Sequence, residues 1–165
     1  MLNSYLIDTI CNMKKVELYT DGACSGNPGV GGWGVVLIYG DYIKEFSGVN
    51  NLTTNNQMEI TAVIEGLKRL KEACDITIYT DSAYTMNAFS EGWITNWQLN
   101  GWKTANKKPV KNAELWQELL NELAKHKVKW VKVKGHADNK YNNICDKLAT
   151  GEIAKYNKTK VIDIN

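Results

Sequence analysis

Alternation of apolar and polar residues in the first third of the chain predicts antiparallel strands. Three runs rich in strand-forming side chains carry this pattern: residues 16–20, 32–39 and 42–49. The pair Gly40-Asp41 between the last two runs favours a hairpin. The segment 21–29 contains three glycines and a proline, and we predict a turn there. Together these features indicate an antiparallel meander.

Helical periodicity dominates the rest of the chain. Thr54 and Gln57 have the spacing of a capping box, so a helix is predicted to begin there, with an apolar stripe that reaches Leu70. Further elements are predicted in this order: a strand at 76–80, a helix after Asp81-Ser82, a helical or looped region with Trp93, Trp97 and Trp102, a helix at 113–125 capped by Asn112, a strand at 128–133, and a closing helix at 142–155. The order β-β-β-α-β-α-α-β-α predicts an α/β fold with helices packed on a mixed sheet.

The length and composition of the chain indicate one folded domain. It has 165 residues, of which 44% are apolar and 23% charged, and no repeat or linker interrupts it. We expect residues 1–14 to be a short extension, residues 15–157 the domain and residues 158–165 a tail. No secretory signal and no membrane-spanning run is present, so we expect a cytoplasmic monomer without a membrane partner. The four cysteines lack C-x-x-C spacing and are expected to be reduced thiols.

Charge is distributed unevenly along the chain although the net charge is only +2. Residues 1–92 hold 6 basic and 11 acidic side chains, whereas residues 93–136 hold 9 lysines and 3 glutamates. A polyanion-binding surface in the later half would have this composition. A solvated lysine-rich face would have it as well, so charge alone leaves both interpretations open.

Four acidic residues lie near the end of a predicted element or on an apolar helix face, where a carboxylate is unexpected. Asp21 and Asp81 each follow a predicted strand in the sequence Tyr-Thr-Asp, Glu59 lies on the apolar face of its helix, and Asp146 lies early in the closing helix. Each could singly be a cap or a turn former. Together at one sheet edge they would repel one another unless cations lay between them, and Mg²⁺ prefers such oxygen ligands. This set fits phosphodiester hydrolysis by a pair of hard cations, whereas zinc is disfavoured because no His/Cys cluster exists.

His136 lies beside Gly135 in a loop, where it could shuttle protons or help products leave. A lone histidine is more often a structural residue, and that alternative stays open.

The chain resembles the bacterial type 1 ribonucleases H over residues 15–155. The matching stretches are Tyr-Thr-Asp-Gly-Ala-Cys-Ser-Gly-Asn-Pro-Gly (19–29), Thr-Thr-Asn-Asn-Gln-Met-Glu (53–59), Tyr-Thr-Asp-Ser (79–82), Gly-Trp-Lys-Thr-Ala-Asn-Lys-Lys-Pro-Val-Lys-Asn (101–112), Val-Lys-Gly-His-Ala (133–137) and Cys-Asp-Lys-Leu-Ala (145–149). Any one of these stretches is weak evidence, but their order and spacing together are specific.

The resemblance implies a five-stranded mixed sheet, an antiparallel meander plus parallel strands, flanked by helices. It places the four metal-binding carboxylates of the family on Asp21, Glu59, Asp81 and Asp146, and the histidine of its mobile loop on His136. Two Mg²⁺ ions, which Mn²⁺ could replace, would cleave the RNA strand of RNA–DNA hybrids and leave 5′-phosphate and 3′-hydroxyl ends. The biological substrates would be R-loops and replication primers.

Substrate contacts are also implied by the resemblance. Gly22, Cys24, Asn55 and Gln57 would contact the RNA strand, and Asn56 and Trp93 the DNA strand. Residues 93–111 resemble the basic protrusion of the family, called the handle, whose phosphate-binding candidates are Lys103, Lys107, Lys108 and Lys111.

The handle departs from the family pattern where Gln98-Leu99-Asn100 replaces an expected basic cluster, so we expect binding through the handle to be weaker and more salt-sensitive. The segment before Trp93 is also one residue longer than in the family pattern. Three other functions stay open: a binding module with a silent site, a nuclease domain of a larger protein, and a structural protein with capping acids.

Overall fold

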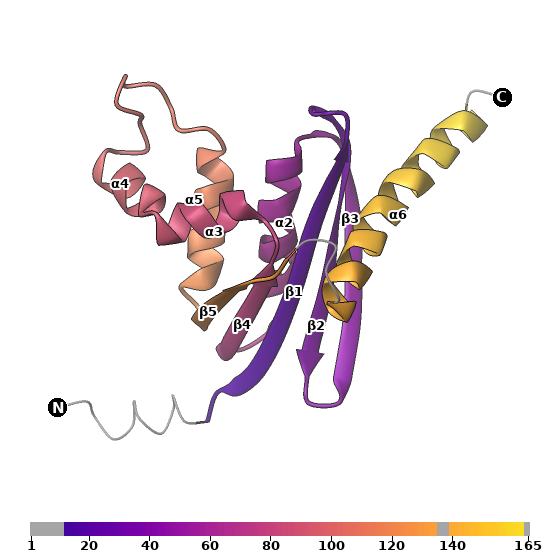
Figure 1. Ribbon diagram of the computed structural model, residues 1–165, viewed down its shortest axis with the longest axis horizontal. Helices are drawn as coiled ribbons and strands as arrows, with labels where there is room; N and C mark the ends of the chain where they lie inside the picture. The colour runs from indigo at the N-terminus through magenta and orange to yellow at the C-terminus, as the bar shows by residue number, and fades with distance from the viewer. Residues whose placement is uncertain (1–11, 135–138, 164–165) are drawn as a thin grey trace.

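The computed structural model describes residues 12–134 and 139–163 and contains a five-stranded mixed sheet (Figure 1). Its strands lie in the order β3-β2-β1-β4-β5. Their bounds are β1 Lys14–Ser25, β2 Gly29–Tyr39, β3 Tyr42–Thr53, β4 Cys74–Thr80 and β5 Lys127–Lys132. Pairs β1–β2 and β2–β3 are antiparallel, and pairs β1–β4 and β4–β5 are parallel. The predicted fold class, a meander joined to parallel strands, is confirmed.

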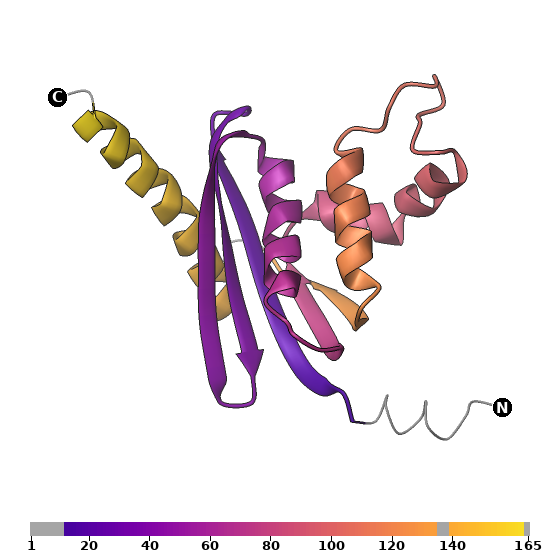
Figure 2. The same ribbon diagram turned by 180° about the vertical axis from the view of Figure 1, so that it is seen from behind.

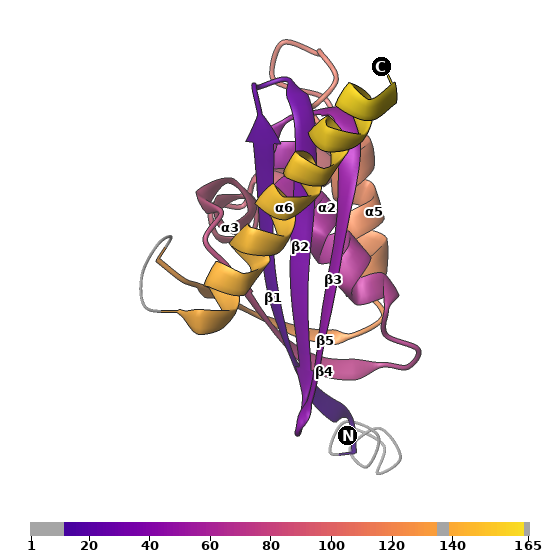
Figure 3. The ribbon, with the colours of Figure 1, turned by 90° about the vertical axis from the view of Figure 1, so that its right-hand side faces the viewer.

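Helices cover both faces of the sheet. They are α2 Asn55–Lys68, α3 Ala83–Ser90, α4 Trp93–Leu99, α5 Ala113–Leu123 and α6 Lys140–Asp163. Helix α6 crosses one face of β1–β3, and α2 and α5 lie on the opposite face (Figures 2 and 3). The larger core lies between the sheet and α2, where Leu18, Ile60 and Ile78 are fully buried. A smaller cluster under α6 contains Tyr19, Val36 and Cys145.

The turn predicted for residues 21–29 is mostly wrong. Strand β1 continues to Ser25, and Asp21 to Ser25 pair in register with Gly34 to Val30 of β2. The chain turns only between Ser25 and Gly29. The glycines at positions 22 and 29 serve close backbone packing, since a Cβ at either would lie within 2.5 Å of a backbone atom. Asp21 therefore lies inside a strand rather than after it.

The elements after β4 differ from prediction in three details. Three helices, not two, connect β4 to β5. Asn112 precedes α5 but makes no side-chain cap, because its backbone is left-handed (φ 61°) and its amide bonds elsewhere. The closing helix continues to Asp163, eight residues past its predicted end at residue 155.

Helix α6 packs directly against the backbone of β2 through two glycines. A Cβ at Gly32 would lie 2.1 Å from the Ala149 carbonyl oxygen, and one at Gly34 would lie 2.3 Å from that of Cys145. Ser47 of β3 donates a hydrogen bond to Glu152 of α6 at 2.8 Å. These contacts determine how closely α6 packs against the sheet.

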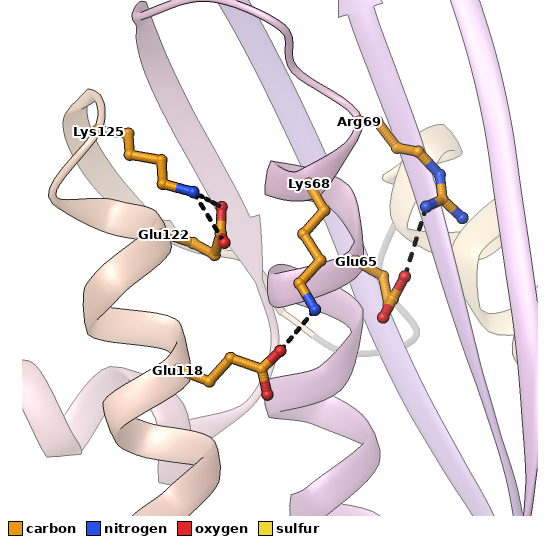
Figure 4. Close-up of polar contacts among 6 residues, drawn as sticks. All are labelled: Glu65, Lys68, Arg69, Glu118, Glu122 and Lys125. Carbon is orange, nitrogen blue, oxygen red and sulfur yellow. Dashed lines mark hydrogen bonds and ion pairs between the residues drawn. The ribbon is translucent and has the colours of Figure 1, made fainter.

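Three ion pairs lie on or next to helices α2 and α5, on the sheet face opposite α6 (Figure 4). Lys68 of α2 bonds Glu118 of α5 at 2.5 Å, Arg69 pairs with Glu65, and Lys125 pairs with Glu122. The lysines and Arg69 are more than a third exposed, so each pair contributes little to stability. None of the helices described in residues 12–134 and 139–163 combines the length and apolarity needed to cross a bilayer.

Candidate active site

Three carboxylates from three different elements meet at one place on the sheet. Asp21 comes from β1, Glu59 from α2, and Asp81 from the residue that follows β4. One oxygen from each lies within 4.8 Å of the other two. Asp21 and Glu59 are only 6% and 5% exposed, so their charges are largely removed from water. Buried like charges at this separation need a compensating cation or a proton.

Close contact between β1 and α2 brings Asp21 to Glu59. A Cβ at Gly22 would lie 2.5 Å from the Glu59 amide nitrogen, so only glycine lets the strand approach the helix this closely. The Gly22 amide donates to Asp21 Oδ1 at 3.0 Å and holds that carboxylate in place. A complete capping box between Thr54 and Gln57 fixes where α2 begins. Glu59 follows in the second turn on the buried face.

Asp146 completes the set from the opposite side of a cleft. The cleft has a volume of about 520 Å³, and all four carboxylates line it. Asp146 lies in the second turn of α6 and stands outside the tight group of three oxygens. Its negative charge nevertheless acts on the Asp21 carboxyl. The structure therefore places the four predicted acids around one cleft, with three in close proximity and the fourth at its edge.

Burial and mutual repulsion raise the pKa of two of these acids. Desolvation, followed by the charge of Asp81, raises the pKa of Asp21 to about 7. Desolvation, followed by the charges of Asp21 and Asp81, holds the pKa of Glu59 well above its usual range. Without a cation these two carboxyl groups therefore hold their protons more tightly than exposed carboxyl groups do.

The donor set fits a hard divalent cation. Glu59 Oε2 is buried and has no hydrogen-bond partner, and none of the described residues that line the cleft is positively charged. Carboxylate oxygens without nitrogen or sulfur donors suit Mg²⁺ or Mn²⁺ better than zinc. Asp21, Glu59 and Asp81 can hold a metal ion, and a cation between them would offset the repulsion that contributes to the raised pKa of Asp21 and of Glu59.

Comparison with known proteins gives the family of this chain. The RNase H family model matches residues 13–154. The chain belongs to the ribonuclease H family. Ribonuclease H from Acetivibrio thermocellus is 61% identical to it over 146 residues, which cover 88% of this chain and 99% of that protein. Ribonuclease H from Caldanaerobacter subterraneus subsp. tengcongensis is 57% identical over 147 residues, which cover 89% and 96%.

Solved structures agree with the sequence matches. LC9-RNase H1, a type 1 RNase H with the type 2 active-site motif, superposes with a TM-score of 0.75 at 29% identity, covering 84% of this chain and 72% of that one. The predicted family, bacterial type 1 ribonuclease H, and the predicted enzyme class are confirmed.

The predicted substrate residues of this ribonuclease H family member divide into two groups. Gly22, Cys24, Asn55 and Asn56 line the cleft with the carboxylates. The Cys24 thiol donates to the Gly26 carbonyl at 2.8 Å, and partial burial raises its pKa. Gln57 and Trp93 are outside the described lining of the cleft.

Trp93 packs in an aromatic cluster at the base of the handle. Its ring lies 6.2 Å from those of Tyr84 and Trp97. Trp97 also contacts Trp102 and Trp116, as expected for side chains that pack the handle. The four handle lysines (Lys103, Lys107, Lys108 and Lys111) are exposed on the loop that projects between α4 and α5 in Figure 1. His136 lies outside the described residues.

Sequence reasoning missed several residues of the cleft lining, among them Asn142 and Tyr84. Asn142 is 2% exposed, and its buried Oδ1 has no hydrogen-bond partner. It precedes Asp146 by four residues, one helical turn, and this spacing was the signal that could have identified it. Tyr84 follows Asp81 by three residues in the first turn of α3, so the same reasoning could have found it.

Proposed function

We propose that this protein is an endonuclease that hydrolyses the RNA strand of RNA–DNA hybrids with two Mg²⁺ ions, for which Mn²⁺ can substitute. The observation that carries the proposal is the buried group of Asp21, Glu59 and Asp81, whose oxygens lie within 4.8 Å of one another. Its repulsion and its unpartnered Glu59 oxygen call for a cation. Family membership supports the same activity, since the relatives named above are ribonucleases H.

The four carboxylates form two sides of the proposed metal site. Asp21, Glu59 and Asp81 would hold one side and Asp146 the other, which would place the scissile phosphate between β1 and α6. Ions held by these four carboxylates would supply the Lewis acidity that activates a water and stabilises the leaving 3′-oxygen. The cleaved strand would then carry 5′-phosphate and 3′-hydroxyl ends. We assign His136 to the proton transfer or product release that follows.

Hybrid recognition would combine the cleft and the handle. Gly22, Cys24 and Asn55 lie beside the carboxylates, where the RNA strand and its 2′-hydroxyls would pass. Asn56 would face the DNA strand. The exposed handle lysines would bind phosphates and supply a salt-dependent part of the affinity. We further propose that the protein acts as a cytoplasmic monomer on R-loops and replication primers.

Strand-specific labelling tests the proposal. A hybrid labelled on either strand is incubated with Mg²⁺, and the product ends are mapped with phosphatase and with end-labelling enzymes. We expect cuts in the RNA strand only, with 5′-phosphate and 3′-hydroxyl ends. Cyclic phosphate or 5′-hydroxyl ends would contradict hydrolysis by metal-activated water.

A further inference from the structure

The handle loop has its own internal structure and is anchored at its base. Lys108 accepts a hydrogen bond from the Thr104 amide at 2.7 Å, and Trp102 accepts one from the Val110 amide at 3.0 Å. Lys103 and Pro109 form an isolated antiparallel bridge. Residues 102–110 therefore form a compact hairpin-like loop. Its orientation relative to the cleft depends on how its two ends are attached to the body.

Asn112, directly after the handle, makes such an attachment through its side-chain amide. Its Oδ1 accepts from Gln57 Nε2 at 3.1 Å, and its Nδ2 donates to the Tyr84 hydroxyl at 3.2 Å. The same hydroxyl accepts from Trp116 Nε1 at 3.3 Å. We call the first three residues, Gln57, Asn112 and Tyr84, the clamp. It joins the start of α2, the start of α3 and the end of the handle.

Every polar atom of the Gln57 side chain is engaged in these contacts. Its Oε1 accepts from Thr53 Oγ1 at 2.9 Å and from the Thr54 amide at 3.1 Å, and its Nε2 bonds Asn112. Both lone pairs of Oε1 and one N–H of Nε2 are used in these bonds, so the side chain is held in place by protein partners. This arrangement favours a positioning role for Gln57, in addition to the substrate contact that the family resemblance implies.

The backbone at Asn112 indicates that the clamp holds the chain in an unfavourable conformation. Its φ of 61° is left-handed, which costs a non-glycine residue about 1 kcal/mol. Two hydrogen bonds to its amide offset that cost. Without these hydrogen bonds the left-handed conformation of Asn112, which sets the direction in which the chain leaves the handle, would be less stable.

The clamp lies between the two surfaces that the proposed function assigns to the hybrid. Gln57 follows Asn55 and Asn56, which line the cleft, and precedes Glu59 by two residues. Tyr84 lines the same cleft. Lys111 on the handle adjoins Asn112. A rigid link here fixes the handle lysines at a set distance from the carboxylates.

We propose that Gln57 is a positioning residue that, through Asn112 and Tyr84, holds the handle lysines in register with the scissile phosphate. This inference rests on the proposed function, because the register matters only for a bound hybrid. It assigns to Gln57 an effect on hybrid binding that is exerted through Lys107 and Lys108 rather than through RNA.

Gln57→Met tests the clamp, with Gln117→Met as its matched control on an exposed face of α5. We expect Gln57→Met to raise the KM for hybrid about three- to tenfold with kcat changed less than twofold, and to reduce the salt dependence of binding. Because Gln57→Met also removes half of the capping box of α2, Tyr84→Phe serves as the second variant. It removes the hydroxyl that bonds Asn112, keeps the ring and leaves the capping box intact, and it should raise KM in the same direction. Gln117→Met should leave KM unchanged. A fall in kcat without a rise in KM would overturn the proposal.

A second background separates positioning from direct contact. In a Lys107→Ala/Lys108→Ala protein, Gln57→Met should raise KM no further, because the link acts through those lysines. A full additional increase in that background would show that Gln57 contacts substrate itself and would refute the clamp.

Hydrogen exchange without substrate keeps this test independent of activity. Gln57→Met should speed exchange of the Thr104, Lys107 and Val110 amides, and Gln117→Met should not. Unchanged exchange would overturn the clamp even if the enzyme cleaves hybrids. If wild type cleaved no hybrid but exchange changed as expected, the proposed function would fail while the link to the handle would stand.

Discussion

Asp21 and Glu59 show at the scale of single residues how a stable fold keeps a destabilising feature. Both are buried within reach of Asp81, and neither has a basic partner among the described lining of the cleft. The raised pKa of each acid reflects a free-energy cost of placing the charged carboxylate there. Such a cost is expected where function, and not stability, determines the residue.

Asp21→Asn should abolish cleavage and preserve hybrid binding. The change removes a metal ligand, and we expect a loss of about a thousandfold or more in kcat, which corresponds to about 4 kcal/mol. Binding should stay the same or tighten, because a negative charge facing phosphates is lost. Single-turnover cleavage and a fluorescence binding assay would measure the two effects. Full activity in this variant would refute the site.

The metal-free protein should lose stability as pH rises through the acidic and neutral range. The folded-state pKa of Asp21 is about 7, above its unfolded value of about 3.8, so the folded state binds the proton more tightly. Stability is therefore lost between these two values, by about 4 kcal/mol at most from this group. In chelator the melting temperature should fall between pH 4 and pH 8, and Mg²⁺ should restore it. The melting temperature of the Asp21→Asn variant should fall less over this pH range. An equal pH dependence in both proteins would contradict the assignment of this effect to Asp21.

Residue type and position in the predicted elements brought the four acids together in the prediction, and the family resemblance added Gly22, Cys24, Asn55 and Asn56. All eight line the cleft, and their roles there stay predictions. Sequence could not show that the Gln57 side chain is already bonded to Asn112, because the two residues are distant in the chain and meet only through the packing of α2 against α5.

At the scale of elements, the active site depends on backbones that touch. Strand β1 meets α2 at Gly22, and β2 meets α6 at Gly32 and Gly34. Glycine-rich stretches in the sequence were interpreted as turns, which was wrong for most of residues 21–29. The alternative use of glycine, close packing within a strand, requires knowledge of which element lies above it. That information comes only from the three-dimensional arrangement.

Two glycine substitutions should have opposite effects on stability. Gly34→Ala places a Cβ 2.3 Å from the Cys145 carbonyl oxygen, so α6 must shift, at an expected cost of about 2–3 kcal/mol or more. Gly151→Ala, inside α6 with nothing within 4 Å of the added Cβ, should stabilise the protein by about 0.5–1 kcal/mol. Urea unfolding would measure both. Equal effects would contradict the packing of α6 on β2.

At the scale of the whole molecule, charge is divided between two places. The acids converge in the cleft, and the handle loop carries four exposed lysines. The sequence already indicated this division through its acidic first half and basic region at 93–136. The loop that carries the four lysines projects between α4 and α5 (Figure 1).

Replacing Lys107 and Lys108 with alanine should weaken hybrid binding without harming chemistry. Loss of two phosphate contacts should raise KM and reduce the slope of log affinity against log salt concentration by up to about 2. Cleavage at saturating hybrid should stay close to wild type. Replacing Lys44 and Lys71, which lie outside the handle, should change neither quantity. An unchanged salt slope would show that the hybrid binds through a surface other than the handle.

The most direct test of the whole account compares four labelled substrates in a gel assay: an RNA–DNA hybrid, duplex RNA, duplex DNA and single-stranded RNA. Each is incubated with Mg²⁺ or with chelator. We predict metal-dependent cleavage confined to the RNA strand of the hybrid. Tight hybrid binding without cleavage would contradict the account and would make the protein a binding module whose four carboxylates need another explanation.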